Sequence, residues 1–266
     1  MIKLGFIGIG NMGGAIIKGV NGKLGNTAVF AYDSDPKKLT DLRNLGATAA
    51  NNIIDIAHKC DYLLIAVKPQ QLDDVLTQIK AANNENLVII SICAGISAEY
   101  IRERTFPKAK VVLVMPNTPM MLGVGASAMS RDDTVSDKEF AFARKVIGAC
   151  GITEVIPEDK MKEVIAINGS SPAFIYVYAL GFVQYAEKVG IDRDVALRLF
   201  AQSLIGSAKM LTESGMAIEE LIKQVSSPGG TTIAGLEKLS EGKLTQVAID
   251  ACEACTKRAY ELGGKS

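Results

Sequence analysis

The chain has 266 residues, of which 48% are hydrophobic, a size and composition ordinary for a soluble α/β protein of one large or two modest domains. Its 29 Lys and Arg residues balance its 29 Asp and Glu residues, which argues against a nucleic-acid-binding protein and against binding to an anionic membrane surface. The five cysteines are an odd number at irregular spacing, and no signal or transit segment is recognisable, so we expect reduced thiols in a cytoplasmic protein.

The N-terminal segment carries a dinucleotide-binding fingerprint. A strand-like run, Ile2–Ile7, leads into Gly8-Ile9-Gly10-Asn11-Met12-Gly13, and a helical stretch follows. In such a motif Gly8 permits the tight turn, Gly10 leaves room for the pyrophosphate, and Gly13 lets the helix pack close to the strand. The order of strand, glycine-rich turn and helix predicts a nucleotide site, although a tight turn without a ligand would show the same glycines.

An acidic residue is expected at the end of the second strand of such a unit, about 20 residues further on. Thr27–Tyr32 is interpreted as that strand, and Asp33 follows it. Its carboxylate would accept hydrogen bonds from the adenosine ribose and would repel a 2′-phosphate, which favours NADH over NADPH. Two alternatives stay open: Lys37 and Lys38 could meet a phosphate, and Asp33 could be a turn or N-cap residue.

The chain up to Pro157 continues as alternating strands and helices. Buried strands are expected at 63–67, 87–92, 111–115, 124–129 and 152–156, and amphipathic helices at 72–82 and 137–149. Continuous apolar strands separated by amphipathic helices are typical of a parallel sheet covered on both faces, here an N-terminal Rossmann domain over 1–157.

The loops after the expected strands carry residues suited to a ligand site. Lys68-Pro69 follows one strand, Cys93-Ala94-Gly95 the next, and Pro116-Asn117-Thr118-Pro119 the one after. Ligands of open parallel sheets bind outside the carboxyl ends of the strands, where these small, proline and amide residues bring the backbone close. Any single loop of this kind could be ordinary turn chemistry.

From residue 158 to the end only helices are expected, at 161–167, 173–188, 193–213, 217–225 and 244–262. The segment 173–183 has no charged or amide side chain, and a helix that is apolar on every side must be buried. It is too short to span a membrane, and the break at 169–172 should prevent its extension upstream. We therefore predict burial against a second subunit, with the central helix of a monomeric domain as the alternative.

A second glycine-rich loop, Ser226-Ser227-Pro228-Gly229-Gly230-Thr231-Thr232, precedes another helical stretch. Its glycines allow successive amides to turn inward, and such a nest at a helix N-terminus suits a carboxylate or phosphate. The alternative is an interhelical turn in which a threonine caps the helix.

The absent motifs also limit the chemistry. The only histidine, His58, has no Ser-His-Asp arrangement around it, and no cluster has metal-ligand spacing, so we expect no metal. A nicotinamide enzyme acting on a ketone or an alcohol usually needs a proton relay, whereas an imine nitrogen can arrive protonated. The lack of an evident proton donor therefore favours an imine substrate.

Taken together, the motifs resemble those of the pyrroline-5-carboxylate reductase family, along nearly the whole chain. The resemblance is carried by five stretches: Phe6 through Gly13, Ala66-Val67-Lys68-Pro69, Met115 through Pro119, Asn168 through Phe174, and Ser226 through Thr232. It implies reduction of 1-pyrroline-5-carboxylate to L-proline by NADH or NADPH. It also implies a helical domain, 158–266, that interleaves with its partner in a homodimer, and the dimers of this family commonly form decamers.

The resemblance also implies roles for individual residues. The cofactor would be held by Gly8, Ile9, Gly10, Asn11, Met12, Gly13, Ala66, Val67, Lys68 and Pro69, with Cys93, Ala94, Gly95 and Asn117 near the nicotinamide. Asn51 or Asn52 would contact the adenosine. The substrate carboxylate would bind Ser227, Pro228, Gly229, Gly230 and Thr231, with Thr232 as the catalytic residue near the ring nitrogen. Asp33-Ser34-Asp35 departs from the serine- or arginine-bearing versions linked to NADPH.

Two other readings remain. A β-hydroxyacid dehydrogenase or another imine reductase could share the architecture, but hydroxyacid enzymes carry a Lys with an Asn four residues later. Here Val164 and Ala166 follow Lys160 and Lys162 at that offset. A dinucleotide sensor without turnover is the alternative from another class, and the loop 226–232 argues against it.

Overall fold

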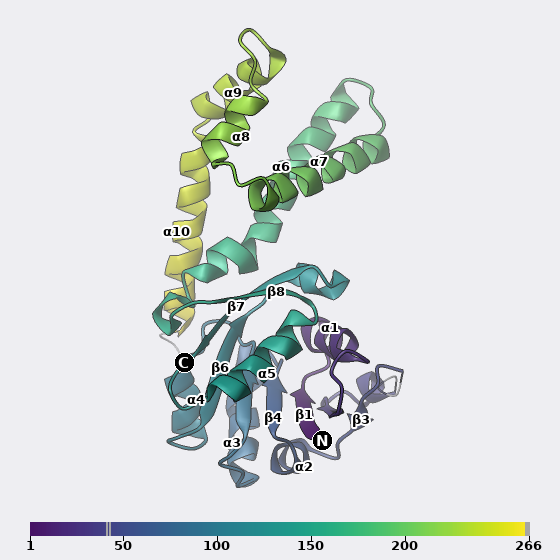
Figure 1. Ribbon diagram of the computed structural model, residues 1–266, viewed down its shortest axis with the longest axis vertical. Helices are drawn as coiled ribbons and strands as arrows, with labels where there is room; N and C mark the ends of the chain where they lie inside the picture. Colours follow the sequence, from purple (N-terminus) through teal and green to yellow (C-terminus); the bar gives the residue numbers. More distant parts are fainter. Residues whose placement is uncertain (41, 43, 264–266) are drawn as a thin grey trace. The chain divides into compact units, whose positions relative to one another are not determined.

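The computed structural model describes residues 1–40, 42 and 44–263, which form two compact units (Figure 1). The first contains Met1–Ser170 together with the chain from Ala254 onward, and the second contains Ser171–Glu253. Residues 165–170 cluster with the first unit because they contact its strands. The domain boundary after residue 157 stays a prediction.

An eight-stranded sheet is the centre of the first unit. Its order is β3-β2-β1-β4-β5-β6-β7-β8, and the first six positions have the strand order of a doubly wound dinucleotide-binding fold, as predicted. The strands are β1 (Ile2–Ile7), β2 (Thr27–Tyr32), β3 (Thr48–Ala49), β4 (Tyr62–Ile65), β5 (Val88–Ser91), β6 (Lys110–Met115), β7 (Gly125–Arg131) and β8 (Gly151–Val155).

The last two strands depart from the expected parallel sheet, because β7 and β8 are parallel to each other and run opposite to the other six. β7 is antiparallel to β6, with Met115 opposite Ala128 and Val112 opposite Arg131. A parallel pair needs a crossover of about a dozen residues or more, usually a helix. The connection here is 116–124 and contains only a 3₁₀ turn, η3 (Thr118–Leu122), so the chain reverses instead.

Helices cover both faces of the sheet because the buried strands send alternate side chains to opposite sides. On one face, α1 (Asn11–Val20) and α5 (Asp137–Gly148) pack on a cluster that includes Phe6 and Leu64. On the other face, a second cluster includes Leu63 and Ile65. The helices over this second cluster are α2 (Ile53–Lys59), α3 (Leu72–Ala81) and α4 (Ala98–Arg104).

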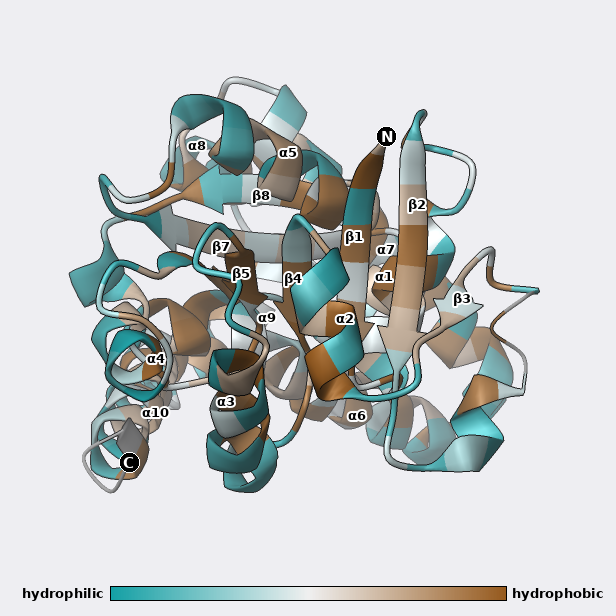
Figure 2. Cartoon of the chain, turned by 90° about the horizontal axis from the view of Figure 1, so that it is seen from below, coloured by the Kyte–Doolittle hydropathy of each residue, from teal (hydrophilic) through white to brown (hydrophobic). Residues whose placement is uncertain are grey.

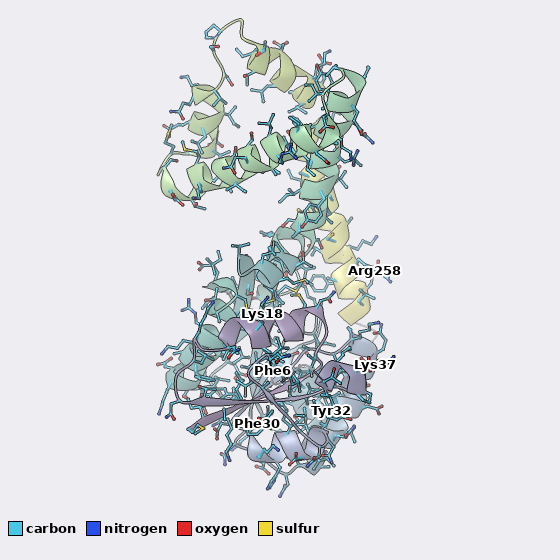
Figure 3. All side chains as sticks on the ribbon, turned by 90° about the vertical axis from the view of Figure 1, so that its right-hand side faces the viewer. Phe6, Lys18, Phe30, Tyr32, Lys37 and Arg258 are labelled. Atoms are coloured by element: carbon cyan, nitrogen blue, oxygen red, sulfur yellow. The ribbon has the colours of Figure 1, made fainter. Side chains whose placement is uncertain are left out.

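The figures show the same separation of core and surface. The central strands are largely hydrophobic in Figure 2. In Figure 3, Phe6 lies within the first unit and Lys18 on the outer side of α1. The helix α1 thus buries Ile16, Ile17 and Val20 while its basic residue faces solvent.

The second unit consists of helices. They are α6 (Ser171–Lys188), α7 (Arg193–Glu213), α8 (Ile218–Gln224), α9 (Thr231–Glu241) and the first part of α10 (Leu244–Gly263). Phe182 of α6 stacks on Phe200 of α7 with ring centroids 4.1 Å apart, and Tyr178 packs edge-on against Phe182 at 5.0 Å. This aromatic cluster joins the two longest helices of the unit.

The break expected at 169–172 is wrong. A π-helical turn, Ile165–Ser170, runs directly into α6, and Pro172 lies in the first turn of that helix. A π turn pairs each N–H one residue further back than an α-helix does, and π turns occur mostly as single turns within α-helical segments. The described residues therefore contain one helix that is long and apolar enough to cross a membrane, Ile165–Lys188, with 11% of its apolar window buried.

Candidate functional site

The first glycine-rich turn has a geometry that only glycine allows. Gly8 has a φ of +93°, and a Cβ on it would lie 2.6 Å from the carbonyl oxygen of Ala66. A Cβ on Gly13 would lie 2.1 Å from the carbonyl oxygen of Gly8, which is the close helix-to-strand approach that the sequence predicts. A Cβ on Gly10 would meet nothing within 4 Å, so the turn is open on its outer side.

The N-terminus of α1 follows this turn without a side-chain cap. Gly10 is the N-cap residue, and it provides no side-chain cap. The first N–H groups of a helix have no partner within the helix, and the helix dipole adds a partial positive charge there. The start of α1 can therefore bind an anion such as a pyrophosphate, consistent with the predicted roles of Asn11, Met12 and Gly13.

A cleft of about 320 Å³ lies beside the turn. Six of the residues predicted to hold a cofactor line it: Gly8, Gly10, Asp33, Ala66, Val67 and Lys68. The sequence-based reasoning missed other lining residues, among them Tyr32, Ser34, Gln71, Asp74 and Gln78. Asn52 is not among the described residues that line it, because its Oδ1 caps α2 by accepting the N–H of Asp55 at 2.8 Å. A contact between Asn52 and an adenosine stays a prediction.

Asp33 is a buried carboxylate at the carboxyl end of β2, 8% exposed. Its Oδ2 accepts the N–H of Ile9 at 2.7 Å, and its Oδ1 accepts the N–H of Asp35 at 2.9 Å. Burial would raise the pKa of Asp33, but the N–H groups of Asp35 and Ile9 and the ammonium of Lys38 outweigh it and lower the pKa. Asp33 therefore stays charged and ties β2 to the glycine-rich turn.

The loops after β5 and β6 form a second, smaller hollow of about 50 Å³. Cys93, Ala94, Gly95 and Met115 line it, together with Lys162 from the segment after β8. Burial raises the pKa of Cys93 to about 11, so the thiol stays protonated at neutral pH. Its Sγ donates to the carbonyl oxygen of Val67 at 3.4 Å, which braces the loops after β4 and β5.

Two asparagines fix the end of β6. Asn117 Oδ1 accepts the N–H of Ala126 at 2.9 Å. From the π turn, the Nδ2 of Asn168 donates to the carbonyl oxygens of Met115 at 2.7 Å and Ala126 at 3.1 Å. Asn117 therefore holds its own loop in place, and Asn168 joins the π turn to β6 and β7. The role of Asn168 was not recognised from the sequence because its partners lie 53 and 42 residues away.

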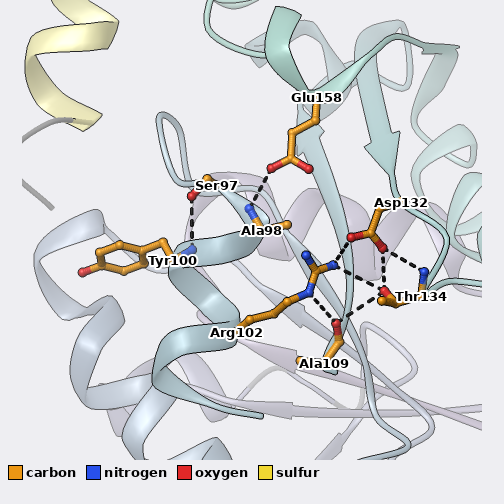
Figure 4. A network of polar contacts seen from close by, with 8 residues as sticks. All are labelled: Ser97, Ala98, Tyr100, Arg102, Ala109, Asp132, Thr134 and Glu158. Atoms are coloured by element: carbon orange, nitrogen blue, oxygen red, sulfur yellow. Dashed lines mark hydrogen bonds and ion pairs between the residues drawn. The ribbon is translucent and has the colours of Figure 1, made fainter. Parts of the chain in front are cut away.

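The helix α4, which follows the Cys93 loop, is anchored at its start (Figure 4). The Oγ of Ser97 accepts the N–H of Tyr100 at 3.1 Å, and Glu158 Oε1 accepts the N–H of Ala98 at 3.0 Å. Arg102 joins the helix to the carbonyl oxygen of Ala109 at 3.1 Å and also pairs with Asp132. These contacts hold α4 beside the hollow that the Cys93 loop lines. The hydrogen bond from Ala98 to Glu158 could not be predicted from the sequence.

The second glycine-rich loop belongs to the helical unit. Gly229 has a φ of +71°, and the N–H of Gly230 donates to the carbonyl oxygen of Ser227 at 3.0 Å. The loop leads into α9, whose N-cap residue is Gly230 and which has no side-chain cap. The alternative in which a threonine caps this helix is therefore wrong, and the first N–H groups of α9 are open to an anion.

The fold and these two open helix N-termini define a Rossmann-type dinucleotide-binding protein with a second, helical unit. A pyrroline-5-carboxylate reductase of Escherichia coli is 31% identical over 98% of this chain and 98% of its own length. Pyrroline-5-carboxylate reductase 3 of Bos taurus is 33% identical over 98% of this chain and 85% of its own length. The chain belongs to the pyrroline-5-carboxylate reductase family.

Models of protein families and a solved structure agree with this assignment. Residues 158–262 match the family described as pyrroline-5-carboxylate reductase dimerisation, and residues 3–95 match NADP oxidoreductase coenzyme F420-dependent. The structure of Plasmodium falciparum pyrroline carboxylate reductase with NADP bound superposes with a TM-score of 0.88 at 29% identity, covering 98% of both chains. The Rossmann and helical organisation predicted from the sequence is thereby confirmed.

Proposed function

We propose that this chain reduces 1-pyrroline-5-carboxylate to L-proline. The observation that supports it most is the likeness, over nearly the whole chain, to proteins named for this substrate. When bound, a nicotinamide coenzyme supplies the hydride that the imine carbon accepts. The nitrogen of the imine can arrive already protonated. The chain's own residues therefore need to bind and orient the substrate rather than act as a strong acid.

The structure suggests how the residues share this work. The open amides at the start of α1 would hold the pyrophosphate, and the loops that carry Cys93 and Asn117 would form the wall for the nicotinamide. In the helical unit, the loop 226–232 and the start of α9 would hold the substrate carboxylate, with the hydroxyl of Thr232 near the ring nitrogen.

The test is an assay of coenzyme consumption. Loss of nicotinamide absorbance on addition of 1-pyrroline-5-carboxylate, together with formation of L-proline, is the expected result. Coenzyme binding without turnover would support the sensor reading instead. Turnover of a β-hydroxyacid with NAD⁺, and none of the imine, would support the related dehydrogenases.

We further propose that NADH is used at least as well as NADPH. The charged carboxylate of Asp33 lines the cleft and would favour a ribose diol over a 2′-phosphate. The expected result is a kcat/KM for NADH equal to or above that for NADPH, measured at saturating imine. A clear preference for NADPH would contradict it.

The assembly is proposed to be a homodimer through the helical unit, with decamers as the next level. The dimerisation match covers this region, and α6 leaves most of its apolar side chains exposed in a single chain. This exposure supports burial of α6 against a second copy rather than within a monomeric domain. Such an interface would account for the long apolar helix without a membrane.

A further inference from the structure

The carboxylate of Asp33 has a third partner in the cleft. The Nζ of Lys38 lies 3.1 Å from Oδ2 and 3.3 Å from Oδ1, so it bridges both oxygens. The N–H groups of Ile9 and Asp35 already occupy one position on each oxygen. A carboxylate offers about four acceptor positions, so a ribose hydroxyl could bind Asp33 only after one of these donors leaves.

The three donors are not equally fixed. Those of Ile9 and Asp35 belong to the backbone of the glycine-rich turn and of the segment after β2. The Lys38 side chain is 42% exposed, whereas that of Asp33 is 7% exposed. A lysine ammonium on a flexible stem can move at small cost, and a half-exposed ion pair contributes little to stability. Lys38 is therefore the donor that can leave.

Lys38 also lines the cleft in which the proposed coenzyme would bind. It lines the same cleft as Asp33 and Ser34, at the end of β2. Its neighbour on the 3₁₀ turn η1 (Pro36–Leu39), Lys37, is absent from the described residues that line the cleft. Figure 3 shows Lys37 at the surface, on the segment that follows Tyr32.

We propose that exchange of Lys38 between Asp33 and the coenzyme sets the coenzyme choice of this enzyme. With NADH, the ribose 2′-hydroxyl takes the place of Lys38 on Asp33. With NADPH, Lys38 turns to the 2′-phosphate and offsets its repulsion by Asp33. This inference rests on the proposed function insofar as the bound dinucleotide is a nicotinamide coenzyme.

The test compares three variants of the full-length protein by fluorescence titration with NADH and with NADPH, in the absence of imine. Lys38→Gln should weaken NADPH binding about tenfold and leave NADH binding nearly unchanged, because only the phosphate loses a charge-assisted hydrogen bond. Asp33→Asn should shift the ratio of the two dissociation constants the other way, toward NADPH. Lys37→Gln is the matched control and should leave the ratio unchanged.

Asp33 also holds the glycine-rich turn, so Asp33→Asn is expected to weaken the binding of both coenzymes. The ratio of the two dissociation constants cancels that common loss. Equal effects of Lys38→Gln on both coenzymes would overturn the proposal, and so would a shift of the ratio by Lys37→Gln as large as that by Lys38→Gln. The binding measurement needs no substrate. If Lys38→Gln and Asp33→Asn shift the ratio in opposite directions but the protein does not reduce the imine, this inference stands and the proposed reaction is rejected.

Discussion

Replacing Leu180 with glutamate is expected to abolish the dimer and, with it, activity. Leu180 lies on α6 and is 45% exposed in the single chain, beside Tyr176 at 64% and Val177 at 72%. If a second copy covers this face, the new carboxylate becomes a buried charge without a partner. Such a charge costs several kcal/mol, which is a large part of the stability of a typical interface or domain.

Light scattering and the coenzyme assay at the same protein concentration would check this expectation. Leu180→Met keeps an apolar side chain of similar volume and should leave both the mass and the activity near those of the wild type. Lys188→Glu is the control for the charge itself: it places a negative charge at the last residue of the same helix, where the side chain is exposed and polar. It should leave the mass and the activity near those of the wild type. An active monomer, either of the wild type or of Leu180→Glu, would contradict the proposed interface.

The sheet of the first unit was predictable because its strands carry their own signal. Ile2–Ile7 and Thr27–Tyr32 form strands with the bounds expected from the sequence. Buried parallel strands are apolar on both faces, so they appear as continuous runs that need no knowledge of their partners. The two-residue strand β3 escaped notice because it is exposed and has no apolar run.

Where the prediction failed, the decisive interaction was not local. The direction of β7 depends on the length of its connection to β6, and the apolar run looks the same in either direction. The segment 169–172, with Gly169 and Pro172, suggested a break. Asn168 nevertheless holds this π turn against β6 and β7 through partners far away in the sequence. Local propensity predicts a stop there, and tertiary contacts override it.

For the site, the sequence identified most of the residue types, and the structure adds how they are held. The glycines and Asp33 follow from the fingerprint motif. That the Asp33 carboxylate is already occupied by Ile9, Asp35 and Lys38 could not be seen, because Ile9 is 24 residues away and a bridging ammonium depends on rotamers. The sequence therefore predicts coenzyme binding and singles out Asp33, whereas the contact between Asp33 and Lys38 needs the structure.

Thr232 is expected to take part in substrate recognition. This residue is exposed in the single chain and lies at the second position of α9, one residue beyond Thr231. Since no side chain caps α9, its first N–H groups are available for the substrate carboxylate. The Thr232 hydroxyl would then be available to hydrogen-bond the ring nitrogen while the imine carbon faces the nicotinamide.

Thr232→Ala should therefore lower kcat/KM for 1-pyrroline-5-carboxylate roughly ten- to a hundredfold, because one hydrogen bond is worth on the order of 1–3 kcal/mol in such a site. The dissociation constant for NADH and the melting temperature should change little, because the hydroxyl caps nothing. Thr232→Ser keeps the hydroxyl and should restore most of the activity, and Ser240→Ala, near the other end of the same helix, should have no effect. A lower melting temperature of Thr232→Ala by the equivalent of about 1 kcal/mol, with unchanged turnover, would assign Thr232 to the structure of the helix instead of to the substrate.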